Sequence, residues 1–360
     1  MKKIILTGGG TAGHVYPALA VAEKLKDYEI HYFGGSGMEK DILKAYPKIT
    51  YHEIPVVKLE RKLTLKNLLI PFKLFRSIRI CKKEIKKLKP NIVFSKGGFV
   101  AVPVVIASHK QKVPVISHES DLSMGLANKI ILRFCKCMCT TFQKTAEKNK
   151  KCVFTGQPIR EKILKGNKNK IQMDENLPYL LILGGSLGAK FLNDFVKENL
   201  DFLTTKFNVM HLHGKQNTTI SFHKNYLPLP YAENIEDYYA RADVVISRAG
   251  SGVINELLVL NKPMLLIPLS KKCSRGDQIE NAKLFQNLNL AKMLEEEDVS
   301  KDSVFENLDY LLKNSDNIKK NMKNYAKNDA KTLIFEIIKE NELKWAYCIP
   351  PQNLVYYASL

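Results

Sequence analysis

The sequence lacks long apolar runs. No apolar run reaches the roughly 18 uncharged residues that a helix needs to cross a bilayer, so we predict a soluble or peripheral protein. The segment MKKIILTGGG has two lysines, but the apolar run that follows them is far shorter than the apolar core of a secretory signal peptide. We therefore expect the chain in the cytoplasm.

Cysteine is also sparse. The seven cysteines stand at irregular positions without a pairing framework, which favours reduced thiols and the same compartment. Cys135, Cys137 and Cys139 alternate as residues on a strand do, but no second pair of ligands accompanies them. A structural zinc site is therefore disfavoured.

Acidic residues are outnumbered, 36 against 56 lysines and arginines, which gives a net charge of +20. Such a charge attracts nucleic acid, anionic lipid or phosphorylated substrates. We expect no nucleic-acid partner, because the sequence has no basic helix-turn-helix pattern and no aromatic RNA-binding motif.

The densest basic stretch runs from Lys58 to Lys89 and includes LLIPFKLFRSIRICKKEIKKLK. Bulky apolar residues interleave there with Lys and Arg, as in amphipathic helices at a lipid headgroup boundary. Each Lys or Arg contributes about 1 kcal/mol of attraction to an anionic leaflet. Two interpretations remain open: contact with an anionic membrane surface, or a solvated helix that packs its apolar side on the core.

A chain of 360 residues exceeds the size at which one core usually stops growing, so we expect two domains. Over the first 155 residues, short apolar runs, glycine turns and helical patterns alternate, which is typical of a parallel α/β sheet. The predicted strands are Ile4–Thr7, Ile30–Phe33, Tyr51–Val56, Ile92–Ser95 and Val115–Ser117. A polar, lysine-rich passage after Gly156 indicates a surface excursion.

The same alternation restarts at YLLILGGSLGAK, with predicted strands at Phe207–His211, Val244–Ser247 and Met264–Pro268. Helical, lysine-rich sequence is expected from about Asp302 to Lys344. We therefore predict two doubly wound, Rossmann-like domains, residues 1–155 and 156–335, and a helix end and tail of unknown role at residues 336–360. A ligand would lie in a central cleft, at the carboxyl ends of both sheets.

A glycine loop follows the first predicted strand: Gly8–Gly13 reads GxGxxG and precedes the helical pattern VYPALAVAEKL. A dinucleotide fingerprint with this spacing also needs an acidic residue at the end of the second strand. That strand ends in Phe33 and Gly34, with Glu29 at the opposite end, so an NAD enzyme becomes a minor alternative. The loop still predicts close approach of a phosphate or sugar to the backbone.

His14 stands directly after this loop, at the predicted first turn of a helix. The positive end of a helix disfavours the imidazolium form, so the ring would stay neutral and able to accept a proton. We favour His14 as a general base over a capping or packing role.

The second half carries matching candidates. Gly184–Gly188 follows a predicted strand, and its amides together with the Ser186 hydroxyl are expected to grip a diphosphate. A second turn, SRAGSG, precedes a helix that bears Glu256, which suits ribose hydroxyls or, alternatively, is a solvated surface group. Asp277 and Gln278 follow the run MLLIPLS, again on the carboxyl side of the sheet.

Together these segments resemble the MurG family of UDP-N-acetylglucosamine transferases. The matching motifs are GGGTAGHVYPALA, FSKGGFVAVP, SHESDLSMGLANK, FTGQPIR, LILGGSLGA, SRAGSGVINE and GDQIENA, which span Lys3 to Phe285 in this order. The resemblance implies a GT-B fold and an inverting hexosyl transfer in peptidoglycan synthesis that uses no cofactor and no obligatory metal.

The resemblance also implies the two substrates and the place of reaction. The donor would be UDP-N-acetylglucosamine. The acceptor would be lipid I, undecaprenyl-pyrophosphoryl-MurNAc-pentapeptide, at the cytoplasmic face of the bacterial inner membrane, and the product would be lipid II. A relative that uses another lipid-linked or glycolipid acceptor remains the alternative, because the acceptor half is read from fewer motifs.

Site residues follow from the same resemblance. For the donor, the resemblance implies that Ser186 and Arg160 contact the diphosphate and that Ala232 faces the uracil. It implies Glu256 as the partner of the ribose, and Gln278 and Asp121 as partners of the transferred sugar. Backbone groups near the phosphate and sugar are implied at Ser251, Gly252 and Val253. The acceptor side is implied to be lined by Thr11, Ala12 and Gly13.

The sequence departs from the family at two points. Asp121 stands where the family often has Asn, and Asp277 begins a pair that is frequently two glutamines. Asp accepts hydrogen bonds but cannot donate as an amide does, so the detail of sugar recognition stays open. The segment Ser95–Phe99, SKGGF, fits either an acceptor-pyrophosphate site or a structural turn.

Overall fold

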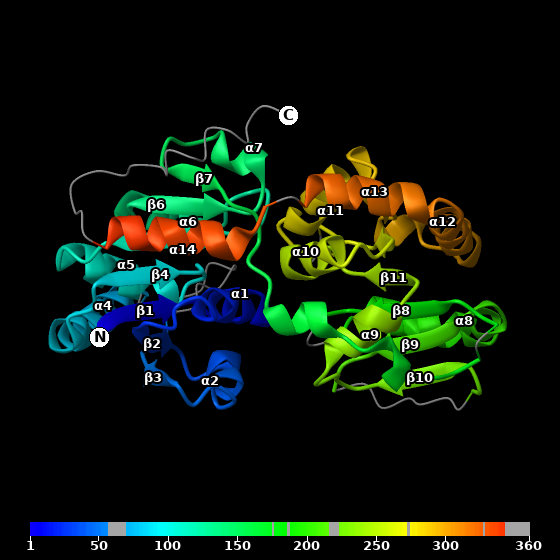
Figure 1. Cartoon of the computed structure of the whole chain (residues 1–360), viewed down its shortest axis with the longest axis horizontal. Helices are drawn as coiled ribbons and strands as arrows, with labels where there is room; N and C mark the ends of the chain where they lie inside the picture. Colours follow the sequence, from blue (N-terminus) through cyan, green and yellow to red (C-terminus); the bar gives the residue numbers. More distant parts are fainter. Residues whose placement is uncertain are drawn as a thin grey trace. The chain divides into compact units, whose positions relative to one another are not determined.

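The computed structural model describes residues 1–56, 70–174, 176–185, 188–215, 223–271, 274–326 and 328–342. The chain forms two compact units: the first contains Met1–Arg160 and the chain from Asn328 onward, and the second contains Glu161–Lys327. Each unit is a parallel sheet flanked by helices (Figure 1). The predicted fold class, two Rossmann-like α/β domains, is confirmed.

The first unit is built on a seven-stranded sheet in the order β3-β2-β1-β4-β5-β6-β7, with every neighbouring pair parallel. Its strands are β1 (Lys2–Thr7), β2 (Tyr28–Gly34), β3 (Ile49–Glu53), β4 (Ile92–Ser95), β5 (Val115–Glu119), β6 (Cys137–Thr140) and β7 (Cys152–Phe154). Ile4 of β1 lies opposite Ile30 on one side and Ile92 on the other. The chain order reverses between β1 and β4, and ligands of such sheets bind at this switch point.

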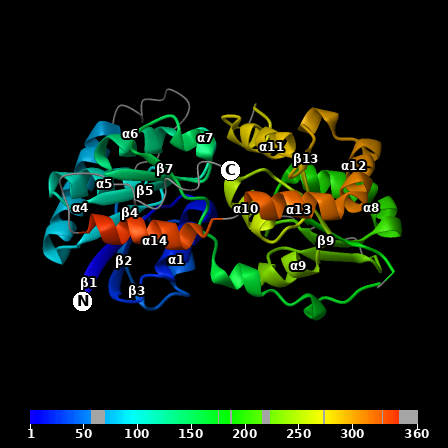
Figure 2. The ribbon, with the colours of Figure 1, turned by 45° about the horizontal axis from the view of Figure 1, so that its top comes forward.

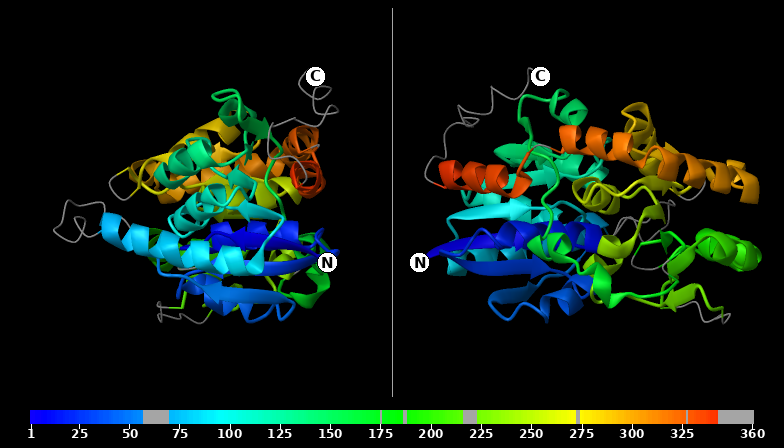
Figure 3. Two further views of the ribbon diagram at one scale, coloured as in Figure 1. Left: turned by 90° about the vertical axis from the view of Figure 1, so that its left-hand side faces the viewer. Right: turned by 45° about the vertical axis from the view of Figure 1, so that its right-hand side comes forward.

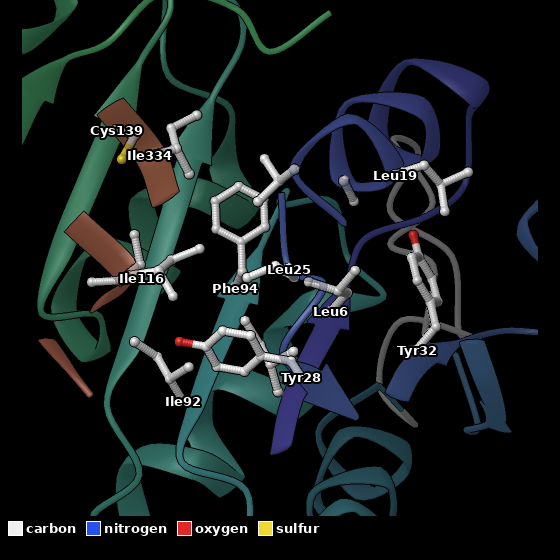
Figure 4. Close-up of a cluster of buried hydrophobic side chains, with 14 of the residues drawn as sticks. Leu6, Leu19, Leu25, Tyr28, Tyr32, Ile92, Phe94, Ile116, Cys139 and Ile334 are labelled. Carbon is white, nitrogen blue, oxygen red and sulfur yellow. The ribbon is translucent and has the colours of Figure 1, made fainter. Parts of the chain in front are cut away.

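Two core layers cover the two faces of this sheet, because successive side chains of a strand point to opposite faces. The helices of the unit are α1 (Ala12–Ala22), α2 (Met38–Leu43), α4 (Ile70–Leu88), α5 (Ala101–Lys110), α6 (Leu126–Phe134), α7 (Gln143–Ala146) and α14 (Ala330–Asn341). Ile4 and Leu6 join α1 and α14 in one layer, shown in Figure 4. Ile5 joins α4, α5 and α6 in the other. Burial on both faces explains why the strands read as apolar runs.

The second unit repeats this plan with a six-stranded parallel sheet in the order β10-β9-β8-β11-β12-β13. Its strands are β8 (Tyr179–Leu183), β9 (Asn208–Leu212), β10 (Tyr226–Leu229), β11 (Val244–Ser247), β12 (Met264–Leu266) and β13 (Lys292–Met293). Its helices are α8 (Lys190–Lys206), α9 (Ile235–Arg241), α10 (Ser251–Val259), α11 (Asp277–Asn287), α12 (Lys301–Lys313) and α13 (Ser315–Tyr325). The chain order reverses between β8 and β11, which defines the second switch point.

The last described helix, α14, belongs to the first unit. Ile334, Ile337 and Ile338 are buried in the core layer with α1, and Lys331 pairs with Glu23 at 2.8 Å between Nζ and Oε2. Figures 2 and 3 show this helix, in red, lying along the first unit. The division of the structure therefore differs from the expected boundary at residue 335, and the first unit also extends past residue 155 to Arg160. Apolar spacing predicts a buried helix face but not the sheet that this face covers.

The strands predicted from apolar runs are all present, with ends shifted by a few residues. The predicted strands do not include β6, for which the sequence shows only the alternation of the cysteines, or the short edge strands β7, β10 and β13. The long helical stretch expected near the C-terminus is broken into α12, α13 and α14. Within the described ranges, no helix is long and apolar enough to cross a membrane. The tail beyond Glu342 lies outside the described residues.

Candidate functional site

Two glycine loops stand at the switch point of the first unit. Gly8–Gly10 follows β1, and the segment Ser95–Phe99 follows β4. Gly97 and Gly98 have φ of 82° and 79°, a backbone conformation that side chains disfavour. A Cβ on Gly98 would lie 2.9 Å from the carbonyl oxygen of Gly9, so the two loops are in close contact. The sequence left a structural turn open for Ser95–Phe99, and this packing shows that the segment does support the first loop.

His14 lies half-buried in the first turn of α1. Its Nδ1 atom is 3.1 Å from the carbonyl oxygen of Lys96. A carbonyl only accepts, so Nδ1 carries a hydrogen, and the neutral form of the ring has its lone pair on Nε2. This hydrogen bond is compatible with the tautomer that a base needs. Thr11, Ala12 and Gly13, at the start of α1, are exposed or half-buried.

Lys96 is a buried lysine with a side chain directed into the unit. Its Nζ donates to Nδ1 of His118 at 2.7 Å and to the Ser120 hydroxyl. Nε2 of His118 lies 2.9 Å from the carbonyl oxygen of Gly156, so this ring is neutral as well. Burial lowers the pKa of Lys96 to about 8, and burial with the charge of Lys96 lowers the pKa of His118 well below its usual value.

Asp121 lies half-buried in the loop after β5, and Glu119 at the end of that strand fixes the loop. The Glu119 carboxylate accepts hydrogen bonds from the backbone N–H groups of Asp121 at 3.0 Å and Gly125 at 3.1 Å. It also accepts from Nδ2 of Asn128 at 2.9 Å. The position of Asp121 is therefore set by a buried neighbour in the same motif.

Arg160 ends the first of the two segments that make up the first unit. Its guanidinium carbon lies 3.7 Å from the centroid of the Tyr16 ring, on α1. Stacking of this kind is worth roughly 0.5–2 kcal/mol and fixes the plane of the guanidinium. The predicted phosphate contact and the predicted base are therefore held by the same helix.

In the second unit, the loop Gly184–Gly188 follows β8 at the switch point. A Cβ on Gly188 would lie 2.2 Å from the carbonyl oxygen of His213, so this glycine permits close packing at the end of β9. Gly185 has a φ of 86°, and a Cβ there would meet no heavy atom within 4 Å. The loop thus borders open space at Gly185. Ser186 lies outside the described residues.

The helix α10 begins on the other side of this switch point, directly after the turn that follows β11. Its N-cap residue is Gly250, which has no side chain to cap the helix. A Cβ on Gly250 or Gly252 would meet no heavy atom within 4 Å. Ser251 is buried against Asn255, and Val253 is half-buried. An uncapped helix start beside open space favours an anion.

Glu256 lies half-buried on α10. Tyr239 of α9, itself 2% exposed, donates its hydroxyl to Oε2 of Glu256 at 3.0 Å. Ala232 is buried in the connection between β10 and α9. The carboxylate predicted to hold ribose is therefore oriented by a tyrosine that the sequence analysis did not identify.

Gln278 lies in the first turn of α11, and its Oε1 accepts the backbone N–H of Leu269 at 3.0 Å. Its amide nitrogen remains as the donor toward a ligand. Asp277 stands beside Arg275, with 3.6 Å between Oδ2 and Nη2. Arg248, the basic residue of the SRAGSG turn, is buried and donates to backbone carbonyl oxygens after β12, so its role is structural.

Within each unit, the structure places some of the predicted residues close to one switch point. In the first, Thr11–His14 lie at the start of α1, and Arg160 stacks on Tyr16 of that helix; in the second, Gly184–Gly185 and Ser251–Glu256 flank the switch point. Asp121, Ala232 and Gln278 lie on other connections, after β5, after β10 and in α11. Sequence reasoning missed the side chain of Lys96 and Tyr239, because each contacts its partner only in the fold. In the described part of the chain, no three His, Cys, Asp or Glu residues are grouped to hold a metal ion.

Residues 4–140 match the glycosyltransferase family 28 N-terminal domain, and residues 179–337 match the C-terminal domain of that family. Together with the two Rossmann-like units, these matches define a glycosyltransferase of the GT-B fold. The crystal structure of MurG from Acinetobacter baumannii has a TM-score of 0.73 and 25% identity, covering 94% of this chain and all of that one.

Curated relatives match at higher identity. The UDP-N-acetylglucosamine--N-acetylmuramyl-(pentapeptide) pyrophosphoryl-undecaprenol N-acetylglucosamine transferase of Clostridium tetani is 48% identical over 95% of this chain and 99% of its own length. A protein of the same name from Clostridium botulinum is 45% identical over 93% and 97%. The chain therefore belongs to the MurG family.

Proposed function

We propose that this chain transfers N-acetylglucosamine from UDP-N-acetylglucosamine to the muramyl sugar of lipid I, giving lipid II for peptidoglycan synthesis. The observation that carries the proposal is the 48% identity to a transferase of that activity over 95% of the chain. Because this similarity runs through both units, it includes the loops at both switch points.

The chemistry needs a base and stabilisation of a leaving diphosphate. The acceptor hydroxyl attacks the anomeric carbon on the face opposite UDP, and the bond from that carbon to the diphosphate oxygen breaks with its electron pair. His14 takes the hydroxyl proton at Nε2, because its Nδ1 is committed to the Lys96 carbonyl. The configuration at the anomeric carbon is inverted.

The second unit supplies most of the donor contacts. The uncapped start of α10 and the amides of Gly184–Gly188 stabilise the charge on the departing UDP, and Arg160 adds a cation. Glu256, held by Tyr239, accepts from the ribose hydroxyls. Gln278 donates an amide hydrogen to the transferred sugar.

A transfer assay tests this function. The protein is incubated with a lipid I analogue and either UDP-N-acetylglucosamine or UDP-glucose, and the product is identified by mass. We expect transfer from the first donor and much less from the second, which lacks the acetamido group. Equal turnover of both donors contradicts the donor assignment. Transfer only to other glycolipids would support the alternative acceptor.

We also infer that α4 contacts an anionic membrane surface and keeps the enzyme at the cytoplasmic face of the inner membrane, where its lipid acceptor would lie. Phe72 is 74% exposed and Phe75 58% exposed, whereas Cys81 and Ile85 farther along α4 are buried. A helix that packs at one end and exposes aromatic rings among lysines and arginines at the other fits a headgroup boundary. Leu68 and Leu69, which precede it, lie outside the described residues.

A further inference from the structure

A buried carboxylate lies beneath the first glycine loop. Glu39, in the short helix α2, is 2% exposed. Its Oε1 accepts the backbone N–H of Gly35 at 2.9 Å, and its Oε2 accepts that of Gly10 at 3.3 Å. In the part of the chain that the structure describes, no lysine, arginine or histidine forms an ion pair with it. Burying a charge without a cation costs stability, so stability alone does not explain this residue.

The loop rests closely on this carboxylate. A Cβ on Gly9 would lie 2.6 Å from Oε1 of Glu39, which leaves no room for a side chain. Gly10 has a φ of 86°, the conformation in which its N–H meets Glu39. Tyr32 donates its hydroxyl to the carbonyl oxygen of Gly8 at 2.7 Å. The backbone that leads into α1, and so to His14, is therefore held from beneath at two points.

The second loop carries a residue of the opposite charge, Lys96. This residue is 1% exposed, and the Cβ atom that a side chain on Gly8 would carry lies 3.0 Å from the Cβ of Lys96. Glu39 is thus under the first loop, and the ammonium group of Lys96 lies on the other side, beside His118 and Ser120 at the end of β5. An anion that approaches both loops is repelled by one buried charge and attracted by the other.

We propose that Glu39 is a positioning residue of the transfer reaction, which fixes the first loop so that His14 faces the acceptor hydroxyl and directs the acceptor's diphosphate away from this loop toward Ser95–Phe99. This inference rests on the proposed function. The Gly10 amide, which would otherwise be available to a phosphate, is already committed to the carboxylate. The acceptor therefore lies with its hydroxyl at the first loop and its diphosphate at the second.

Glu39→Gln tests this role because it keeps the size of the side chain and removes the charge. The matched control is Asp41→Asn on the same helix, where the side chain is 73% exposed and pairs with Lys44. We expect Glu39→Gln to lower kcat about 10- to 100-fold, as for a small displacement of a reacting group. KM for UDP-N-acetylglucosamine should stay unchanged, because the donor loops lie in the second unit. Inorganic diphosphate should inhibit Glu39→Gln more strongly than wild type.

A double-mutant cycle separates positioning from general support of the fold. If Glu39 acts through His14, Glu39→Gln should add little to the loss already caused by His14→Ala. Gly9→Ala, whose Cβ would push the carboxylate from the loop, should lower kcat in the same way and keeps the test available if Glu39→Gln does not fold.

Two outcomes overturn the inference. One is an unchanged kcat in folded Glu39→Gln, whether or not its melting temperature is lower, and the other is multiplicative losses of kcat in the double mutant. If His14→Ala lowers kcat relative to the wild-type enzyme but Glu39→Gln does not, this inference fails and the proposed function stands. If the wild-type enzyme transfers nothing to a lipid I analogue, the proposed function fails and this inference with it.

Discussion

His14 is oriented by a backbone carbonyl, an acceptor that no side-chain substitution removes. His14→Ala takes away the imidazole that accepts the proton and leaves the loops in place. We expect turnover to fall by about 10²- to 10⁴-fold, with UDP affinity and melting temperature near wild type, since most of the proposed donor contacts lie in the second unit. His109→Ala, at an exposed position in α5, is the control. Near-normal turnover with a lowered melting temperature would assign His14 a structural role.

Glu256 and Tyr239 form a pair in which one residue binds and the other orients. Glu256→Ala should weaken UDP binding by about 1.5–3 kcal/mol for each charged hydrogen bond that it loses. Tyr239→Phe should cost less, about 1 kcal/mol, because the carboxylate remains and only its neutral partner is removed. Calorimetric titration with UDP measures both. Equal affinities for Glu256→Ala and wild type would remove Glu256 from the site.

Local pattern predicts some of these residues and misses others. His14, Glu256 and Gln278 stand within a few residues of glycine turns, so their place at a sheet edge could be predicted from the sequence. Glu39 and Lys96 could not, because Glu39 meets Gly10 across 29 positions and Lys96 meets His118 across 22. Such pairs depend on strand order, which a single sequence does not specify.

The helix α4 has one exposed surface and one surface that packs on the first unit. Phe72 and Phe75 are exposed beside Lys73 and Arg76, whereas the other face packs on α5. If this end of the helix meets lipid, binding to liposomes should increase with the fraction of anionic lipid and weaken with salt. Phe72→Ser with Phe75→Ser should reduce binding, and Phe202→Ser in the second unit, 37% exposed, is the control. If the fraction of protein that sediments with liposomes does not change with lipid charge or salt, the result favours the alternative in which α4 only packs on the core.

The C-terminal helix shows where element prediction stops. Its buried isoleucines give a clear amphipathic period, so a helix there is predictable. Its attachment to the first unit depends on the core layer that it shares with α1 and the sheet, which the sequence of α14 alone does not specify. The edge strands β7, β10 and β13 are missed for a different reason, because they do not stand out as apolar runs: β7 has three residues, β10 contains Pro228, and β13 has two residues and begins with Lys292.

Over the whole molecule, the repeated order of strand, glycine turn and helix was sufficient to predict two parallel sheets with loops at their carboxyl edges. The order of the strands reverses once in each sheet, between β1 and β4 and between β8 and β11, and the four glycine-rich loops follow these four strands. The correspondence has a physical basis: loops diverge on either side of a reversal, which leaves room for a ligand beside the backbone.

Each unit also buries a neutral histidine, and this makes the stability of the whole molecule sensitive to acid. Burial lowers the pKa of His211 to about 4, and burial with the Lys96 charge lowers the pKa of His118 well below its usual value. Below the unfolded value of about 6.5, the unfolded chain binds protons that the folded units do not bind. The free energy of unfolding should therefore decrease as the pH is lowered from about 6.5 to about 4, by roughly 1.4 kcal/mol per pH unit from His211, with a further decrease from His118.

Guanidinium chloride unfolding at pH 7, 6 and 5 measures this loss. His211→Gln, which removes the titrating ring near Asn193 and Tyr226, should make the pH dependence of the second unit shallower even if it lowers stability at pH 7. Because His118 lies in the first unit and His211 in the second, the first unit should keep its full dependence in this variant. A pH dependence that is the same in wild type and His211→Gln would show that His211 does not contribute to it.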